Sequence, residues 1–248
     1  MKLVTERYTL SAGLGRAMTF AFVSDLHDSD GAQVLDALAA CATELDAVLV
    51  GGDVIHNHAV YQNGVEFLTA CAKRWKTFCC IGNHERYYTG DLASLIGSTG
   101  AVLLDNEAVV YGNVVIGGVS SGFSQGTCRT HDKRGLLWRL RSTPPPDTNF
   151  LERFCAMPGY KLLLCHHPEY WKPYVKPLPI DLTLSGHAHG GQWRLFGQGI
   201  FSPGQGLFPR YTSGLYHGRL LVSRGIGNPH HRIPRIANRP MIALITLT

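Results

Sequence analysis

Short, almost wholly apolar runs that each end in a polar cluster constrain the fold of this chain most. The run over 18–24 leads directly into Asp25-Leu26-His27, and the run over 47–50 ends in Gly51-Gly52-Asp53. Such runs are typical of strands buried on both faces of a sheet. Segments with helical spacing of apolar residues follow the polar clusters. The sequence therefore predicts a repeated order of strand, polar loop and helix, in which the carboxyl ends of the strands carry chemistry.

This order favours two sheets with helices outside them. Strands are predicted over 18–24, 47–50, 77–81, 101–104, 108–111, 114–119, 160–165, 180–184, 193–195, 220–223 and 241–247, and helices over 32–45, 64–75, 91–96 and 151–155. The strands between 101 and 119 are joined by short turns and predict a hairpin. The expected fold class is α/β, a two-sheet β-sandwich flanked by helices, as a single domain over 1–248. The polar segment 122–147 is predicted to be a lid or excursion.

The composition indicates a globular protein and excludes some classes of function. Apolar residues make up 45% of the 248 residues and charged residues only 17%. This balance argues against a disordered chain and against a protein that wraps nucleic acid. The net charge of +5 is compatible with anionic substrates.

The cysteines and the hydropathy both bear on the compartment. The seven cysteines include no CxxC pair, which favours buried thiols in a reducing compartment. The start of the chain has no apolar core of a signal peptide, and no apolar stretch reaches the length of a spanning helix. We expect a cytoplasmic protein without a transmembrane segment. Peripheral membrane contact and the oligomeric state stay open.

Five polar clusters supply acids, an amide and imidazoles at successive predicted strand ends. They are Asp25-Leu26-His27, Gly51-Gly52-Asp53, Gly82-Asn83-His84-Glu85, His166-His167 and Gly186-His187-Ala188-His189. Taken alone, Asp53 is explained by a turn or a helix cap and Asn83 by a turn. Taken together, the clusters form an O/N ligand set large enough for two metal ions. In an extended segment, residues two positions apart face the same way, so each of the pairs Asp25/His27 and His187/His189 is expected to converge on one point.

The series of clusters resembles the calcineurin-like metallophosphoesterases, whose pattern runs D-x-H, G-D, G-N-H-[D/E], H and G-H-x-H. The segments 184–192 and 221–227, together with Tyr211 and Gly214, resemble the YkuE-type bacterial phosphodiesterase branch. The resemblance covers about residues 18 to 248 and implies the four-layer αββα fold. It also implies a hydrolase that uses a hydroxide held between two metal ions for in-line attack on phosphorus.

Residue roles follow from the same resemblance. It implies that Asp25, His27 and His189 hold one metal and that Asn83, His166 and His187 hold the other. Asp53 bridges both metals, and His166 is preferred to His167 because the family's ligand begins a His-x-Pro triplet. The metals are divalent or trivalent ions of manganese, iron, zinc, cobalt or nickel. His84 is expected to face the substrate and stabilise or protonate the leaving oxygen. Glu85 is expected either to orient His84 or to be a surface acid in a cap or ion pair.

The sequence indicates the substrate contacts less clearly than the metal ligands. Candidate cations are Arg86, Arg129, His131, Lys133, Arg134, Arg224, His230 and Arg232. Of these, Arg224 lies in the resembled Ser-Arg-Gly-Ile-Gly segment, and Arg86 follows the GNHE cluster. The Gly/Pro-rich loop over 197–214 is expected to be pinned by its own aromatic residues, with an apolar lip for a substrate as the alternative. Asp28 is expected to cap the helix that begins at Ala32.

The expected function is that of a dinuclear metal-dependent phosphohydrolase, with a phosphodiesterase favoured. A metal-binding or scaffold module without catalysis is the alternative, and a mononuclear zinc hydrolase acting on amides is a third possibility. The substrate is a phosphate ester of a small molecule, a nucleotide or a lipid-linked group, and no specific nucleic acid is expected. The branch often carries an amino-terminal membrane segment that this sequence lacks, so the resemblance does not imply a lipid substrate.

Overall fold

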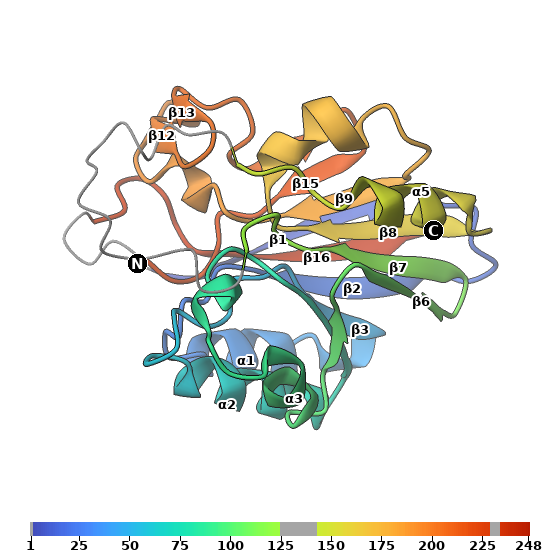
Figure 1. Cartoon of the computed structure of the whole chain (residues 1–248), viewed down its shortest axis with the longest axis horizontal. Helices are drawn as coiled ribbons and strands as arrows, with labels where there is room; N and C mark the ends of the chain where they lie inside the picture. The colour runs from blue at the N-terminus through green and yellow to red at the C-terminus, as the bar shows by residue number, and fades with distance from the viewer. Residues whose placement is uncertain (1, 125–142, 229–233) are drawn as a thin grey trace.

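Two six-stranded sheets lie face to face in the computed structural model of the chain, which describes residues 2–124, 143–228 and 234–248 (Figure 1). The first sheet has the order β1-β16-β2-β3-β4-β5 and the second β14-β15-β9-β8-β7-β6. In the first sheet the strands are β1 (Val4–Leu10), β2 (Met18–Val23), β3 (Ala47–Val50), β4 (Lys76–Cys80), β5 (Val102–Leu104) and β16 (Met241–Leu247). In the second they are β6 (Glu107–Tyr111), β7 (Val114–Val119), β8 (Tyr160–Cys165), β9 (Leu182–Ser185), β14 (Gly214–Tyr216) and β15 (Leu220–Val222).

Helices cover the outer faces of both sheets (Figure 1). Helices α1 (Ala32–Ala39), α2 (Gln62–Ala72) and α3 (Leu92–Gly97) pack on the first sheet, and α5 (Thr148–Ala156) packs on the second. Short helices lie at Ala42–Glu44 (η1), Glu85–Tyr87 (η2), Pro168–Tyr170 (η3), Trp171–Val175 (η4) and His189–Gly191 (η5). Two small hairpins, β10 (Arg194–Leu195) with β11 (Gln198–Gly199) and β12 (Phe201–Ser202) with β13 (Gly206–Leu207), complete the described elements.

Alternation along the strands explains the layers. In β2, Phe20 and Phe22 point between the sheets, whereas Ala21 and Val23 point toward the helices. Both sets are buried, as expected for a strand that is covered on both faces. The predicted fold class, a two-sheet sandwich flanked by helices, is confirmed by this arrangement.

Several predicted boundaries are wrong in detail. The predicted helix over 32–45 ends at Ala39 and continues only as the separate turn η1. The predicted hairpin over 101–119 is divided between the sheets, because β5 pairs with β4 whereas β6 and β7 pair with each other. The edge strand β1 was not predicted, since Glu6 interrupts the alternation of apolar residues on its half-buried face.

The prediction that Asp28 caps α1 is also wrong. Its carboxylate Oδ1 accepts a hydrogen bond from the backbone N–H of Gly64, in the first turn of α2, at 2.7 Å. The residue before α1 is Gly31, which offers no side-chain cap. Asp28 therefore ties the loop after β2 to the neighbouring helix and holds this loop beside the strand ends.

The predicted lid over 122–147 lies mostly outside the described residues, which stop at Ser124 and resume at Thr143. Its two described ends meet at one side chain of η3, the short helix after β8. The phenol of Tyr170 accepts a hydrogen bond from the backbone N–H of Gly122 and donates one to the carbonyl of Pro144.

Candidate metal centre

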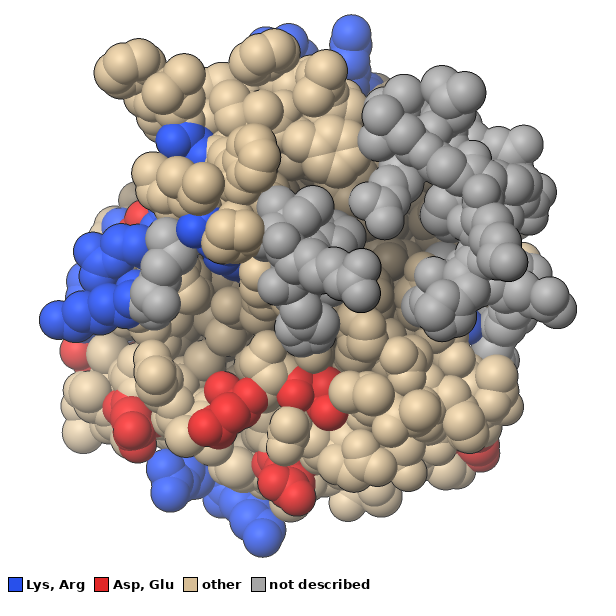
Figure 2. Space-filling view, turned by 90° about the vertical axis from the view of Figure 1, so that its left-hand side faces the viewer, with Lys and Arg blue, Asp and Glu red and all other residues tan. Residues whose placement is uncertain are grey.

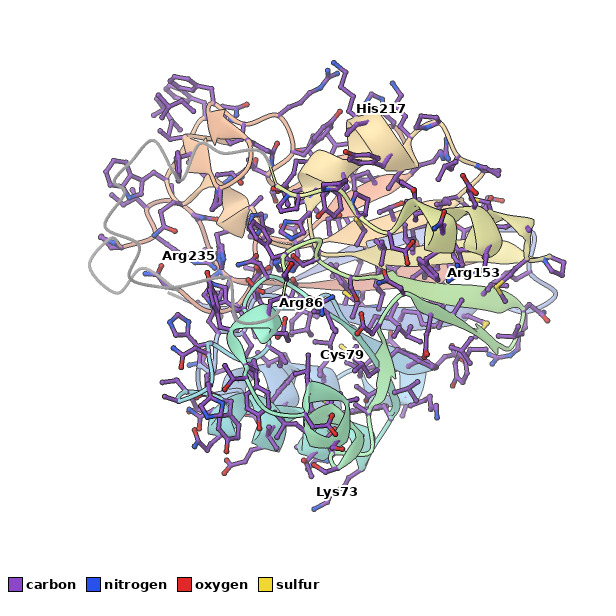
Figure 3. The ribbon with its side chains drawn as sticks, viewed as in Figure 1. Lys73, Cys79, Arg86, Arg153, His217 and Arg235 are labelled. Carbon is purple, nitrogen blue, oxygen red and sulfur yellow. The ribbon has the colours of Figure 1, made fainter. Side chains whose placement is uncertain are left out.

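The predicted ligands come together where strands of both sheets end. The strands β2, β3 and β4 run parallel and bring their carboxyl ends to one edge of the first sheet. The parallel strands β8 and β9 do the same in the second sheet. Backbone hydrogen bonds join the loops that follow, from Asp25 N–H to Gly52 O at 3.0 Å and from Gly186 N–H to His166 O at 3.0 Å. Figure 3 labels Arg86 and Arg235 at this end of the sheets and Arg153 away from it.

Asp25, His27 and His189 form one group, whose ligand atoms lie within 4.8 Å of one another. The two Nε2 atoms of His27 and His189 are 3.0 Å apart. Asp25 Oδ1 lies 3.4 Å from His189 Nε2 and 4.0 Å from His27 Nε2. All three side chains are buried, so their donor atoms converge on a point that solvent reaches poorly.

Asp53, His166 and His187 form a second group with the same spacing. Asp53 Oδ2 lies 3.2 Å from His166 Nε2 and also 3.7 Å from His27 Nε2 in the first group. One carboxylate oxygen therefore reaches imidazoles of both groups. Asn83, the remaining predicted ligand, is also buried, and its Oδ1 has no hydrogen-bond partner.

The geometry of the His166 ring tests whether these residues suit a cation. Its Nδ1 lies 2.7 Å from the carbonyl of Gly51, which can only accept a hydrogen bond, so Nδ1 carries the proton. In the neutral ring, the lone pair of Nε2 then faces the Asp53 carboxylate, and Nε2 has no hydrogen-bond donor. Two buried acceptors so close together require a positive charge between them. Burial would lower the pKa of His166, but Asp53 outweighs it and raises this pKa to about 10, so without a metal a proton on Nε2 supplies the charge, and a metal ion would take the place of that proton. The donor set of carboxylates, imidazoles and an amide oxygen suits the transition metals of the prediction.

The backbone at these residues is left-handed and not extended. The φ angles are 56° at Asp25, 49° at His27, 52° at Asp53, 62° at His187 and 45° at His189. We expected each of the pairs Asp25/His27 and His187/His189 to converge because the segment is extended, and this expectation is wrong. A left-handed residue turns the chain sharply at each strand end, so both side chains of a pair are directed to the same side. Such strain in residues other than glycine clusters at functional sites.

Close backbone approach also fixes the loop sequences. A Cβ on Gly186 would collide with the side chains of Ser24 and Asp25, and one on Gly82 would collide with the Asp53 carboxylate. Glycine is required at both positions because the loops of neighbouring strands lie against the ligand side chains.

The burial of the site determines the charge of its groups. Burial lowers the pKa of His187 to about 3 and that of His27 and His189 well below the ordinary value, so these imidazoles are neutral and able to donate a lone pair. Burial alone would raise the pKa of Asp53, but the nearby His166 and His84 outweigh it and hold this pKa well below its ordinary value.

The structure places Glu85 away from its predicted role. Its two carboxylate oxygens accept backbone N–H bonds from Gly82 and Asp53, at 2.8 Å each, and from Val54 and Ile55, at 2.8 and 3.3 Å. It is 1% exposed, so it is not a surface acid. Its hydrogen bonds go to backbone groups, whereas the His84 ring is held by the carbonyl of His56. Glu85 shapes the loop that carries Asp53.

A backbone carbonyl orients the His84 ring, which lies against the first group of ligands. Its Nδ1 donates to the carbonyl of His56 at 2.7 Å, so Nε2 is the ring nitrogen that this bond leaves available. The ring lies edge-on to His27, with centroids 4.4 Å apart, and is less buried than the ligands. His84 N–H also donates to Asp53 Oδ1 at 2.7 Å, so the position of this ring is coupled to that of Asp53.

The two arginines predicted to bind substrate are engaged by the protein. Arg224 donates from Nη2 to Glu6 Oε1 at 2.7 Å, from Nη1 to Ser213 Oγ and from Nε to the carbonyl of Arg239. Arg86 pairs loosely with Asp105, at 3.5 Å. The other candidate cations, Arg129, His131, Lys133, Arg134, His230 and Arg232, lie outside the described residues.

Sequence reasoning missed four residues beside the site. Glu169 Oε1 lies 3.2 Å from His167 Nδ1 and 3.7 Å from His187 Nε2, and Thr143 Oγ1 donates to the same oxygen. Arg235 Nη2 lies 3.2 Å from His189 Nδ1. His56 groups with His27 and His84. The sequence offers a hint only for Glu169, which follows His166-His167-Pro168 directly.

Six cysteines fall within the described residues, all of them as free thiols, and five of these are buried. Burial raises the pKa of the Cys71 thiol to about 12 and raises that of Cys79 further. These thiols behave as apolar groups. No helix in the described part of the chain combines the length and the apolar character that crossing a bilayer requires.

Comparison with known proteins identifies the family. The family model described as calcineurin-like phosphoesterase matches residues 18–191. The chain belongs to the calcineurin-like phosphoesterase family. This phosphoesterase is similar to phosphodiesterase YaeI of Escherichia coli K12, with 31% identity over 99% of this chain and 88% of that protein. It is also similar to the uncharacterized metallophosphoesterase YkuE of Bacillus subtilis 168, with 28% identity over 90% and 77% of the two chains.

Among solved structures, the phosphoesterase chain is similar to the sulfate thiohydrolase SoxB of Thermus thermophilus, with a TM-score of 0.49 and 14% identity. The match covers 83% of this chain and 51% of that one. The family and the relatives support a hydrolase that acts on phosphate esters and uses metal ions. The predicted membership of the family is confirmed.

Proposed function

We propose that this protein is a dinuclear metal-dependent phosphodiesterase. One observation carries the proposal: Asp53 Oδ2 lies within 3.7 Å of imidazole nitrogens from both ligand groups, 3.2 Å from His166 Nε2 and 3.7 Å from His27 Nε2. A carboxylate in this position is suited to bridge two cations. The similarity to YaeI, which is named a phosphodiesterase, supports diesters over monoesters.

In this proposal each metal has its own protein ligands. Asp25, His27 and His189 hold one ion, and Asn83, His166 and His187 hold the other, with Asp53 shared between them. Manganese, iron, zinc, cobalt and nickel all suit this ligand set. Two such ions would supply positive charge for the phosphate oxygens and would lower the pKa of water toward neutrality.

The protein supplies the remaining parts of the reaction. His84 is positioned by its Nδ1 hydrogen bond to the carbonyl of His56, so a protonated ring offers Nε2–H to the leaving oxygen of the substrate. The carbonyl prevents the ring from presenting the other nitrogen. Glu85 accepts hydrogen bonds from three backbone N–H groups of the Asp53 loop and from Gly82 N–H in its own loop, and it thereby fixes the distance between the shared carboxylate and His84.

The proposal is tested with a panel of phosphate esters after manganese reconstitution. We expect the wild-type protein to hydrolyse bis-p-nitrophenyl phosphate faster than p-nitrophenyl phosphate. His84→Ala is expected to lower kcat by about 10² to 10⁴-fold while both metals stay bound. Full metal occupancy without turnover of any ester would favour a binding or scaffold module in place of an enzyme. Elemental analysis that gives one metal per chain would favour a mononuclear hydrolase.

A further inference from the structure

Two small hairpins next to the metal centre expose large apolar side chains. Among the residues that the structure describes, most large apolar side chains left exposed lie on or beside β10–β13. They are Trp193, Leu195, Phe196, Leu207, Phe208 and Ile236, which we call the hydrophobic tip. The expectation that aromatic residues pin the loop over 197–214 therefore holds for the buried Tyr211 and in part for the half-buried Phe201, but not for Phe208. Exposed apolar side chains that gather on two neighbouring hairpins indicate an interaction surface.

The conformation of the tip favours an external contact. Phe196 is fully exposed and has a φ of 47°, and it forms the turn between β10 and β11 together with Gly197, whose φ is 83°. Such two-residue turns strongly favour Asn and Gly, because both residues are left-handed. Phe208 is 68% exposed and has a φ of 50°. Two aromatic rings in strained backbone that bury little surface do not stabilise the fold.

The tip is attached firmly to the loop that carries His189. Gln198 Nε2 donates to the carbonyl of Pro209 at 2.9 Å, and Phe208 N–H donates to the carbonyl of Ile200 at 2.8 Å, so the two hairpins are tied together. Ile200 N–H donates to the carbonyl of Gly191, the last residue of η5, at 3.1 Å. A surface that binds the tip is therefore held at a fixed place relative to the metal centre.

Acidic and basic residues are distributed unevenly along the chain, and this distribution indicates the kind of surface that the tip binds. All 18 acidic residues lie within 1–181, whereas seven arginines and no acid follow in 182–248. Arg210 and Arg239 are exposed, and Arg210 is two positions from Phe208. Figure 2 shows most of the acidic side chains in view over the lower half of the face, away from the part of the molecule that carries β12 and β13 in Figure 1. The region of the tip thus attracts anionic surfaces.

We propose that the hydrophobic tip docks the protein on a bilayer surface that contains anionic phospholipid. The apolar side chains enter the boundary between headgroups and acyl chains, and the nearby arginines meet the lipid phosphates. A projecting hairpin with a fully exposed Phe196 fits a deformable apolar layer better than a preformed protein surface. The docked protein presents its metal centre beside the membrane. This inference does not depend on the proposed phosphodiesterase activity.

Sedimentation with vesicles tests the proposal on the full chain. We expect binding to vesicles of 70% phosphatidylcholine and 30% phosphatidylglycerol, and weaker binding at 500 mM than at 50 mM salt, because the headgroup attraction is screened. The double variant Phe196→Asn/Phe208→Asn is expected to weaken binding at least tenfold, since burial of one such ring is worth that much. Asn is tolerated at positive φ, so this variant retains the fold, which circular dichroism checks.

Two matched controls separate docking from general effects. Val110→Asn removes an exposed apolar side chain on β6, outside the tip, and is expected to leave vesicle binding unchanged. Arg210→Gln is expected to reduce binding several-fold, whereas Arg153→Gln on α5, outside the tip, has no effect. Equal sedimentation of the wild type and the double variant would overturn the proposal. So would the absence of vesicle binding together with self-association that the double variant abolishes, because the tip would then bind a second copy of the chain.

Discussion

A buried glutamate and a half-buried one support the two halves of the candidate metal centre in different ways. Glu85, from the half built by the first sheet, accepts hydrogen bonds only from backbone N–H groups. Glu169, from the half built by the second sheet, faces the side chains of His167, His187 and Thr143. The first acid holds a loop in place, whereas the second holds imidazole rings in place.

The difference extends to the charge of each acid. Burial raises the pKa of Glu85, and the neighbouring Asp53 raises it further. Burial would also raise the pKa of Glu169, but His187 and His167 outweigh it and lower this pKa to about 2. One side of the site therefore depends on the exact path of the backbone, and the other on contacts between side chains. Loss of the first acid is expected to affect folding, and loss of the second to affect metal binding.

Glu85→Ala is expected to have the largest effect on stability. It leaves four buried backbone N–H groups without acceptors, which costs about 4 kcal/mol in the free energy of unfolding. For a chain of this size the melting temperature should fall by roughly 10 °C, measured by scanning calorimetry on the metal-free protein. Glu85→Gln retains one acceptor oxygen and should lose less. A fall below about 2 °C for the alanine variant would contradict the role of Glu85 as the anchor of the Asp53 loop.

Glu169→Gln is expected to act on metal affinity and to spare the fold. Loss of the carboxylate beside His187 should weaken metal binding about 10- to 100-fold, as measured by competition with a chelator. The melting temperature of the metal-free protein should change less than in Glu85→Ala, because the glutamine amide keeps an oxygen that accepts the hydrogen bonds of Thr143 and His167. Equal destabilisation by the two variants, with unchanged metal affinity, would remove the distinction between the two acids.

Arg224→Gln is expected to have the smallest effect. Its ion pair with Glu6 joins a loop that follows the second sheet to the edge strand of the first sheet and is partly exposed, so we expect a loss of less than about 1 kcal/mol. Burial would raise the pKa of Glu6, but hydrogen bonds from Tyr8 and Arg224 outweigh it and lower this pKa. The contribution is therefore complete above the ordinary pKa of 4.5 and is lost as the pH falls through the lower folded value.

Urea denaturation of wild type and Arg224→Gln between pH 3 and 7 measures this difference. The two stabilities should converge as the pH falls below 4.5, and KM for the diester should stay unchanged at neutral pH. A large rise in KM with little change in stability would restore Arg224 as a substrate contact.

The sequence predicted the two sheets and the gathering of the ligands because both depend on short-range patterns. Apolar runs such as 18–24 and 160–165 have the length and composition of buried strands. The polar residues directly after them have to meet at one edge, since β2, β3 and β4 run parallel. The same reasoning cannot predict the contacts of side chains outside this edge, because their partners lie far away in the sequence.

Glu85 and Arg224 show why such roles were not predictable. Glu85 contacts Val54 from 31 positions away, and Arg224 contacts Glu6 from 218 positions away. Only the folded chain determines which backbone groups need an acceptor and which acid is free to pair. The left-handed backbone of Asp25 and His27 was equally hidden, since neither residue requires a positive φ. The exposure of Phe196 was not predictable either, since it depends on a hairpin whose turn has only two residues.

Metal content and turnover, measured together on wild type and Asp53→Asn after manganese reconstitution, test the central claim most directly. The account predicts two metal ions per wild-type chain with hydrolysis of bis-p-nitrophenyl phosphate. It predicts at most one ion per Asp53→Asn chain and no hydrolysis above background, because one carboxylate oxygen serves both ligand groups. Two ions per chain and undiminished hydrolysis in Asp53→Asn would contradict it.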